Sequence, residues 1–307
     1  MRSARRRLIK SREIKVWKKG IILPAIILIA ILAFCLWFFV ISAHFWNGSD
    51  KLAVTSRREN GDASVIVFDP KLSEITTLTI PGDTEVNVAR NLGTMRLKNV
   101  WQLGENEKAT GKLLAETLTN NFRFVSFLWI DSAGEGLVGS NFLKLTKFLF
   151  VPGSTNLSFR DRLGIVIFSS KVGNSGRTEI DLAKSLFLQK GKLSDGEAGF
   201  KISENLMERL TIYFSDYSLA EGSVRSFIND ETGEFGVANE FGKIIETMGA
   251  KVVSIDKKTV SETDCVVSGG ERVYVEKIAR IFSCKEVISG EKNVISINIG
   301  SKFAKRF

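Results

Sequence analysis

The stretch Ala63-Ser-Val-Ile-Val-Phe-Asp-Pro-Lys-Leu-Ser-Glu-Ile-Thr-Thr-Leu-Thr-Ile80 sets the architecture of the first globular part of the chain. Residues 63–68 are rich in β-branched and apolar side chains, and residues 74–80 alternate in the way that strands do. Asp69-Pro70 followed by Lys71 supplies turn residues between them. The pattern predicts a β-hairpin.

Helices and further strands are expected after this hairpin. The clearest helix is Lys108–Phe122, which has apolar side chains near helical spacing and leads into an apolar strand at Val125–Ile130. A short helix over 86–92 and a break at Gly104 are also expected. This alternation of strands and helices favours an α/β layer fold.

Residues 140–220 carry a weaker pattern. The apolar cluster over 142–151 is too short to span a bilayer and predicts a buried helix, with an interfacial helix on the membrane as the alternative. Residues 163–169 predict a core strand, and residues 180–188 a helix.

The last part of the chain predicts a smaller domain made of two β-α-β units. The first unit has a strand at 223–229, an amphipathic helix at 236–248 that stops at Gly249, and a strand at 251–255. The second unit is expected at 265–268, 273–282 and 294–299. Gly233 and Gly236 predict a tight strand-to-helix turn, because the Lys and Thr of a phosphate-binding loop are missing.

The N-terminus predicts a membrane anchor. Residues 1–19 contain nine Lys or Arg and one acid, Glu13, and Ile21–Trp46 is an almost unbroken apolar run of 26 residues. At about 1.5 Å per residue this run exceeds the roughly 30 Å hydrocarbon core of a bilayer. We expect a cytoplasmic tail over 1–19 and a transmembrane helix over 20–46, with Trp17 and Trp46 as interfacial anchors.

The expected location is therefore the cytoplasmic membrane, crossed once, with the bulk of the chain extracytoplasmic. The alternative is a cleaved signal peptide, whose apolar region usually has about 7 to 15 residues. The apolar run here is much longer than that, so we favour the anchor over the signal peptide.

Composition narrows the classes of function. The formal net charge of +9 includes +8 from the tail, so only +1 remains beyond residue 19 and a nucleic-acid partner is not indicated. The single histidine, His44, has no metal-ligand companion, which argues against zinc chemistry and a histidine-based triad. No cofactor or metal is expected.

The cysteines permit one disulfide. Cys35 lies inside the predicted span, whereas Cys265 and Cys284 lie close together in the exterior part. A bond between Cys265 and Cys284 would contribute on the order of 3 kcal/mol in the chain-entropy model. Two buried free thiols are the alternative.

The first exterior domain, 47–220, resembles a known family. The run from Val65 to Thr84 is similar to the opening of the LytR-CpsA-Psr (LCP) domain, where two strands and an Asp/Asn-Pro turn end in Ile-Pro-Arg-Asp-Thr, and Phe127-Leu-Trp-Ile-Asp131 is similar in order. The resemblance implies an enzyme that faces outward behind one N-terminal anchor. Such enzymes transfer glycopolymers from a polyprenyl pyrophosphate to peptidoglycan.

The sequence departs from this family at the charged positions that the family uses for catalysis. Gly82 stands at the family's arginine, Asp83 remains, and Asp62 lies about one residue from the family's upstream aspartate. Asp83 is either a turn-capping carboxylate or a catalytic one, and we favour the turn cap. The segments Arg160-Asp161-Arg162 and Gly176-Arg177-Thr178 do not follow the family's arginine pattern, and we expect Arg160 and Arg162 in a solvated loop instead of a phosphate clamp.

The second exterior domain, 221–307, resembles the LytR C-terminal domain. Four landmarks keep their order: Val224-Arg-Ser-Phe-Ile-Asn229, Gly236-Val-Ala238, Met248-Gly-Ala-Lys-Val-Val253 and Val294-Ile-Ser-Ile-Asn-Ile-Gly300. The resemblance implies a binding or scaffolding module without catalytic residues.

Three hypotheses follow. We favour a membrane-anchored envelope protein that binds cell-wall glycopolymer or another envelope protein without catalysis, with the lipid bilayer as a further partner. The alternative is an active transferase that uses Asp83 and Asp62 on a divalent metal such as Mg²⁺. The third is a tethered scaffold with no carbohydrate ligand.

Overall fold

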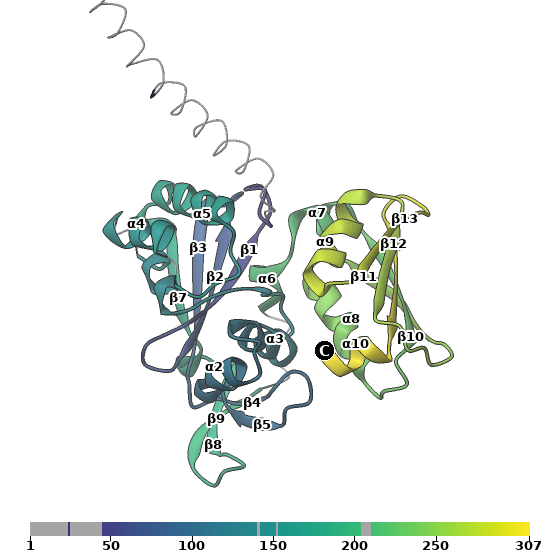
Figure 1. The fold of residues 1–307 in the computed structure, drawn as a ribbon, viewed down its shortest axis with the longest axis horizontal. Helices are drawn as coiled ribbons and strands as arrows, with labels where there is room; N and C mark the ends of the chain where they lie inside the picture. The colour runs from purple at the N-terminus through teal and green to yellow at the C-terminus, as the bar shows by residue number, and fades with distance from the viewer. Residues whose placement is uncertain (1–23, 25–44, 140–141, 152, 204–209) are drawn as a thin grey trace, which may run out of the picture. The chain divides into compact units, whose positions relative to one another are not determined.

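The computed structural model describes Pro24 and residues 45–139, 142–151, 153–203 and 210–307 (Figure 1). The predicted tail over 1–19 and nearly all of the predicted span over 20–46 fall outside these residues, as does Cys35. Within the described part, none of the helices has the length and apolar character that a membrane crossing requires. Phe45–Phe307 forms one unit, which contains two sheets of five strands each.

The first sheet has the predicted hairpin at its centre. Its strands, in spatial order, are β6 (Leu128–Ile130), β1 (Leu52–Arg57), β2 (Ala63–Asp69), β3 (Glu74–Ile80) and β7 (Arg177–Asp181). Strands β1, β2 and β3 are antiparallel, whereas β6 runs parallel to β1 and β7 parallel to β3. The hairpin is confirmed: Phe68 pairs with Ile75, and Asp69 Oδ1 accepts the backbone N–H groups of Lys71 and Leu72, each at 3.1 Å.

Strand β2 is buried on both faces because helices cover both sides of this sheet. Val65 and Val67 belong to one core with residues of α2 (Leu97–Asn106) and α3 (Gly111–Phe122). Ile66 and Phe68 belong to a second core with residues of α4 (Phe142–Phe150) and α5 (Phe159–Lys171). The predicted α/β layering is therefore present as three layers.

Several expected elements differ from the structure. The predicted strand at 163–169 lies inside α5, because a capping box at the start of this helix, formed by Ser158 and Asp161, fixes a helical backbone. The predicted helix at 86–92 is instead the small hairpin of β4 (Glu85–Asn87) and β5 (Thr94–Arg96), and Gly104 does not break α2.

The segment 180–188, predicted as a helix, contains the end of β7, the short 3-10 helix η3 (Leu182–Lys184) and Leu188, where a further strand begins. Strand β8 (Leu188–Lys192) pairs with β9 (Ala198–Ile202) in a separate hairpin. The cluster over 142–151 forms α4, which buries Leu145 and Phe148 and exposes Leu143 and Phe150. The remaining short helices here are η1 (Ser132–Leu137), η2 (Asn174–Gly176), α6 (Thr211–Phe214) and α7 (Tyr217–Glu221).

The second sheet contains the first predicted β-α-β unit. The second unit differs from the prediction, because the strand that follows its helix and runs parallel to 265–269 is 285–288, whereas the predicted closing strand at 294–299 runs antiparallel to it. Its strands, in spatial order, are β11 (Lys251–Lys257), β10 (Arg225–Glu231), β14 (Val294–Gly300), β12 (Cys265–Gly269) and β13 (Lys285–Ile288). Helices α8 (Val237–Thr247) and α9 (Arg272–Phe282), with the terminal α10 (Ser301–Arg306), belong to its core. Gly249 follows the end of α8 at φ 103°, the left-handed stop that the sequence predicts.

The chain enters the folded unit at Phe45 and Trp46. Neither residue is helical, and Trp46 is 8% exposed, with its ring 5.7 Å from that of Phe168. Its indole nitrogen donates to the carbonyl oxygen of Asp50 at 2.8 Å. Trp46 therefore belongs to the core next to α5, and the expectation that it is an interfacial anchor is wrong.

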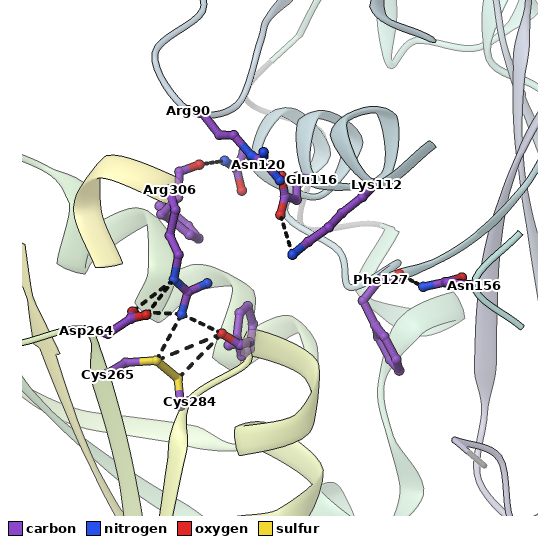
Figure 2. A network of polar contacts seen from close by, with 12 residues as sticks. Arg90, Lys112, Glu116, Asn120, Phe127, Asn156, Asp264, Cys265, Cys284 and Arg306 are labelled. Carbon is purple, nitrogen blue, oxygen red and sulfur yellow. Dashed lines mark hydrogen bonds and ion pairs between the residues drawn. A yellow bond between two sulfur atoms is a disulfide. The ribbon is translucent and has the colours of Figure 1, made fainter. Parts of the chain in front are cut away.

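A disulfide joins Cys265, at the start of β12, to Cys284, two residues after α9. The two Cα atoms are 4.8 Å apart, and the guanidinium of Arg306 lies beside the bond, with Nη2 3.2 Å from Cys265 Sγ (Figure 2). The same guanidinium donates to Asp264 and to the carbonyl oxygen of Phe282, so the C-terminal helix is attached to this corner of the sheet.

Candidate functional site

Asp83 lies in the turn that follows β3, and two basic side chains neutralise it. Its Oδ1 accepts hydrogen bonds from Lys98 Nζ at 2.7 Å and from Arg96 Nη1 at 2.8 Å. These hydrogen bonds, Lys98 first, hold the pKa of the Asp83 carboxyl below its usual value. The carboxylate is therefore paired with cations, and the turn-capping role expected from the sequence is not what its side chain does.

Arg96 also pairs with Asp195, at the tip of the β8–β9 hairpin. Arg96 Nε lies 2.7 Å from Asp195 Oδ2, and this pair lowers the pKa of Asp195 and raises that of Arg96. The hairpin is attached at two further points, because Ser194 donates to Glu85 and the backbone N–H of Phe200 donates to the carbonyl oxygen of Asp83 at 3.1 Å. The guanidinium next to Asp83 is thus shared between two carboxylates.

Asp62 supports the same turn. Its Oδ1 accepts the backbone N–H of Gly82 at 2.8 Å, and its Oδ2 accepts from the side-chain amide of Asn60 at 2.7 Å. The structure therefore brings the two predicted acidic residues to one turn, with Asp62 fixing its backbone and Asp83 forming its ion pairs.

Gly82, at the position of the family's arginine, has no room for a side chain. A Cβ added there would lie 2.5 Å from the carbonyl oxygen of Gly61 and 3.0 Å from Lys98 Cβ. Real Cβ atoms do not approach backbone so closely, so any larger residue would force the two turns apart.

The cleft beside this turn has a mixed lining. It has a volume of about 490 Å³, and its charged side chains are Arg58, Asp62, Glu179, Asp181 and Lys184. These carry a formal charge of −1, and Arg58 already donates to Thr79 and lies 3.3 Å from Glu179. Such a lining disfavours a pyrophosphate, whose oxygens need free guanidinium groups.

The other candidate arginines stabilise helix ends. Arg162 Nη1 donates to the carbonyl oxygen of Leu149 in the last turn of α4, at 2.6 Å, and Arg177 Nη2 donates to that of Ser169 in α5, also at 2.6 Å. Burial lowers the pKa of both. Arg160 and Arg162 lie in the first turn of α5, so the expectation of a solvated loop is wrong.

The Mg²⁺ required by the transferase alternative does not fit this turn. Both Asp62 oxygens and Asp83 Oδ1 already accept hydrogen bonds from amide and cationic donors, and the neighbouring Lys98 and Arg96 would repel a second cation, whereas Mg²⁺ needs carboxylate oxygens that are free to coordinate it. Across the described part of the chain, no group of three or more His, Cys, Asp or Glu side chains is arranged to hold a metal ion.

The structure has a second cleft that no sequence pattern predicted. It has a volume of about 740 Å³ and is lined by residues of β4, α3, the β9 strand and the β10–α8 loop. Phe235, which is 96% exposed, lines it together with several asparagines. The sequence feature that could have indicated it is a phenylalanine between two glycines, Gly233 and Gly236. In the structure both glycines adopt positive φ.

Of the comparisons with known proteins, the one with solved structures finds matches. No protein-family model matches the sequence, and no curated protein matches it. The solved structures that it resembles include proteins of the LCP family. B. subtilis TagT is 13% identical, with 55% of this chain and 91% of that chain covered at a TM-score of 0.39, and B. subtilis TagV is 10% identical, with 54% and 95% covered at 0.40.

A third structure is TagT (YwtF), described as a LytR-CPS2A-psr family protein with bound octaprenyl pyrophosphate lipid, at 13% identity, 55% and 90% coverage and a TM-score of 0.39. This is the family that the sequence resembles. At identities of 10–13%, this likeness concerns the fold alone.

Proposed function

We propose that this protein is a single-pass membrane protein of the cell envelope whose extracytoplasmic part binds cell-wall glycopolymer, or an envelope protein that carries it, without transferring the polymer. The observation that carries the proposal is the packing of Gly82 against Gly61, which leaves no space for an arginine where the LCP resemblance expects one.

The neighbouring charges support a loss of transfer chemistry. Recognition of a pyrophosphate needs guanidinium groups whose N–H donors are free to form paired hydrogen bonds with phosphate oxygens. Arg96 already binds Asp83 and Asp195, and Arg162 and Arg177 bind helix carbonyls. An activated Asp83 would need a raised pKa to act as a general base near neutral pH, whereas its pKa is lowered.

Transfer is tested with the full chain in detergent. It is incubated with a labelled polyprenyl-pyrophosphate-linked glycan and peptidoglycan, with and without Mg²⁺, next to the Asp83→Ala variant. We expect the chain to sediment with sacculi and to release no polyprenyl product in any condition. Release that requires Asp83 would establish the transferase alternative instead.

Binding separates the proposal from the scaffold hypothesis. A chain that neither sediments with sacculi nor captures a glycopolymer-bearing protein is a scaffold without carbohydrate ligand. Sedimentation of the chain with sacculi, without transfer, is the expected result.

The anchor is supported by the sequence alone, through the nine basic residues before an uncharged run from Gly20 to Ser49. Protease added to intact cells with a permeabilised outer layer should digest the region after residue 46, while a cytoplasmic marker protein stays intact. A chain that survives this treatment in full would contradict the proposed orientation.

A further inference from the structure

The cleft of about 740 Å³ is lined by side-chain amides that are already held in place. Asn121 donates to the carbonyl oxygens of Asn87 and Thr117, each at 2.7 Å, and accepts the N–H of Asn87 at 3.0 Å. Its side chain therefore fixes the wall formed by β4 and α3. Such a rigid wall lowers the entropic cost of binding a ligand.

Two of the asparagine side chains in the lining use one polar atom in a hydrogen bond within the protein, so their other polar atom is available to a ligand. Asn120 Nδ2 donates to the carbonyl oxygen of Phe307, while its Oδ1 has no protein partner among the described residues (Figure 2). Asn87 Oδ1 accepts from Thr94 Oγ1 at 2.8 Å, which leaves its Nδ2 as a donor. Asn91, exposed at positive φ, adds a third amide. The cleft thus presents neutral donors and acceptors, and those of Asn87 and Asn120 are fixed in place.

Phe235 stands at this cleft on a structured turn. Its side chain is the most exposed of the large apolar side chains in the described part, at 96%. The turn is held by Thr232 Oγ1, which donates to Asp230 Oδ1 at 2.6 Å and accepts the N–H of Glu234 at 3.1 Å. An aromatic ring exposed to this extent loses favourable burial unless a ligand covers it.

The charges of the lining cancel. The cations are Arg90, Arg123 and Lys201, and the anions are Glu85, Glu234 and Glu240. Arg123 pairs with Glu240 at 2.8 Å, and Arg90 pairs with Glu116 at 2.8 Å (Figure 2). An anionic polymer or an anionic lipid surface would need an excess of positive charge, and this cleft has none.

We infer that this cleft binds an uncharged glycan segment, with Phe235 stacking against the apolar face of a sugar ring and the amides of Asn87, Asn91 and Asn120 hydrogen-bonding its hydroxyl or acetamido groups. Sugars present these two kinds of surface together, and a cleft with an aromatic side chain and a few fixed polar groups matches them. The inference rests on the proposed binding function and specifies its ligand as the neutral part of the cell wall.

The test uses the full chain in detergent and two probes: sacculi from which phosphate-linked polymers have been removed by acid, and untreated sacculi. Phe235→Ala should weaken binding to both at least about tenfold, the loss expected of an aromatic anchor. Phe235→Trp should retain binding. Leu186→Ala, at a side chain that is 75% exposed and outside the lining, is the matched control and should bind like the parent.

The salt dependence of binding and the acid treatment of the sacculi show whether the ligand is neutral or anionic. We expect equal binding to the two probes, with little change between about 0.1 M and about 1 M salt, which shortens the screening length from about 10 Å to about 3 Å. Binding that is lost on acid treatment or falls steeply with salt would identify an anionic ligand and overturn the inference.

Two further outcomes separate this inference from the proposed function. If Phe235→Ala binds like the parent, the cleft is not the glycan site, although the proposed binding function stands. If neither probe binds the parent chain, the proposed function fails and the inference fails with it.

Discussion

Gly82 packs so closely against Gly61 that a Cβ added at position 82 would lie 2.5 Å from the carbonyl oxygen of Gly61 and 2.9 Å from its carbonyl carbon. The turn is fixed further by the Gly82 N–H, which donates to Asp62, and by the Lys98 N–H, which donates to the carbonyl oxygen of Gly82 at 2.9 Å. The backbone itself therefore excludes the arginine that the LCP resemblance expects.

Gly82→Ala should lower the free energy of unfolding by about 1 to 3 kcal/mol, because overpacking must displace backbone. Urea denaturation measures this loss of stability, as a lower midpoint at an unchanged m-value. Gly191→Ala is the control, since a Cβ there would meet nothing within 4 Å. Equal stability of the parent and Gly82→Ala would show that the turn yields easily.

Arg96→Ala should release the β8–β9 hairpin. The variant loses the ion pairs to Asp83 and Asp195, so the pKa of both carboxyls should rise toward their usual values, as an NMR titration would show. A carboxyl with a lowered pKa stabilises the fold above its unfolded pKa and loses this effect as pH falls through the folded pKa. The parent should therefore lose more stability than Arg96→Ala when acid is added below the usual aspartate pKa.

Amide exchange over Leu188–Ile202 provides a second measurement of the same variant. It should accelerate in Arg96→Ala, because the tip of the hairpin loses its Asp195 contact. Lys98→Ala is the control, since Lys98 binds Asp83 without contacting Asp195 directly. Acceleration in both variants would mean that the Asp83 turn, and not Arg96, holds the hairpin.

The disulfide should stabilise the C-terminal sheet measurably. Replacing both Cys265 and Cys284 by alanine, or reducing the parent, should lower the free energy of unfolding by about 3 kcal/mol, because the unfolded chain regains the freedom that the bond removes. The two treatments should agree. A non-reducing mass measurement in which both thiols of the parent react with alkylating reagent would contradict the bond.

The sequence predicts the elements whose pattern is local. The alternation over 63–80 and the amphipathic stretch over 236–248 are enough to define a hairpin and a helix, and the structure has both. The run Ile165-Val-Ile is ambiguous by itself, and the capping box that Ser158 and Asp161 form just before it decides for a helix.

The candidate site was predictable only in part. Pro81-Gly82-Asp83 indicates a turn, and Asp62 and Asp83 do meet there. The partners of Asp83 come from residues 13 and 15 positions away, and Asp195 is 99 positions from Arg96, so no local pattern reveals the ion pairs. The same holds for Phe235, whose exposure becomes visible only when the loop is folded.

Stability at high pH should depend on Tyr217. Its hydroxyl donates to Asp69 Oδ2 at 2.8 Å, and burial, followed by the Asp69 carboxylate, raises its pKa from 10 to about 12. Because the folded pKa is raised, the stabilisation is fully present below pH 10 and is lost as the pH rises toward 12. Tyr217→Phe should therefore be less stable than the parent at neutral pH, by about 1.5 kcal/mol for a hydrogen bond to a charged group, and the difference should shrink above pH 10. A difference independent of pH would refute the assigned pKa.

Asp161 should hold the entry of the chain into the folded unit. Its Oδ1 accepts the N–H groups of both Phe45 and Trp46 at 2.9 Å, and its Oδ2 accepts from Ser158 Oγ at 2.7 Å. Asp161 is 1% exposed, so Asp161→Ala would leave two backbone donors without a partner and remove a helix cap. The expected loss of unfolding free energy is about 3 kcal/mol, measured by urea denaturation.

Limited proteolysis localises the effect of Asp161→Ala. Cleavage next to Trp46 should become faster in the variant, because the indole ring leaves the core when its backbone is released. The control is Asp181→Ala, where a carboxylate that is 36% exposed accepts a single backbone N–H, of Ala183, at 3.0 Å. That variant should lose only about 1 kcal/mol and keep the protection at Trp46. Equal losses in the two variants would mean that Asp161 acts as an ordinary helix cap and that the entry of the chain is held by Trp46 packing alone.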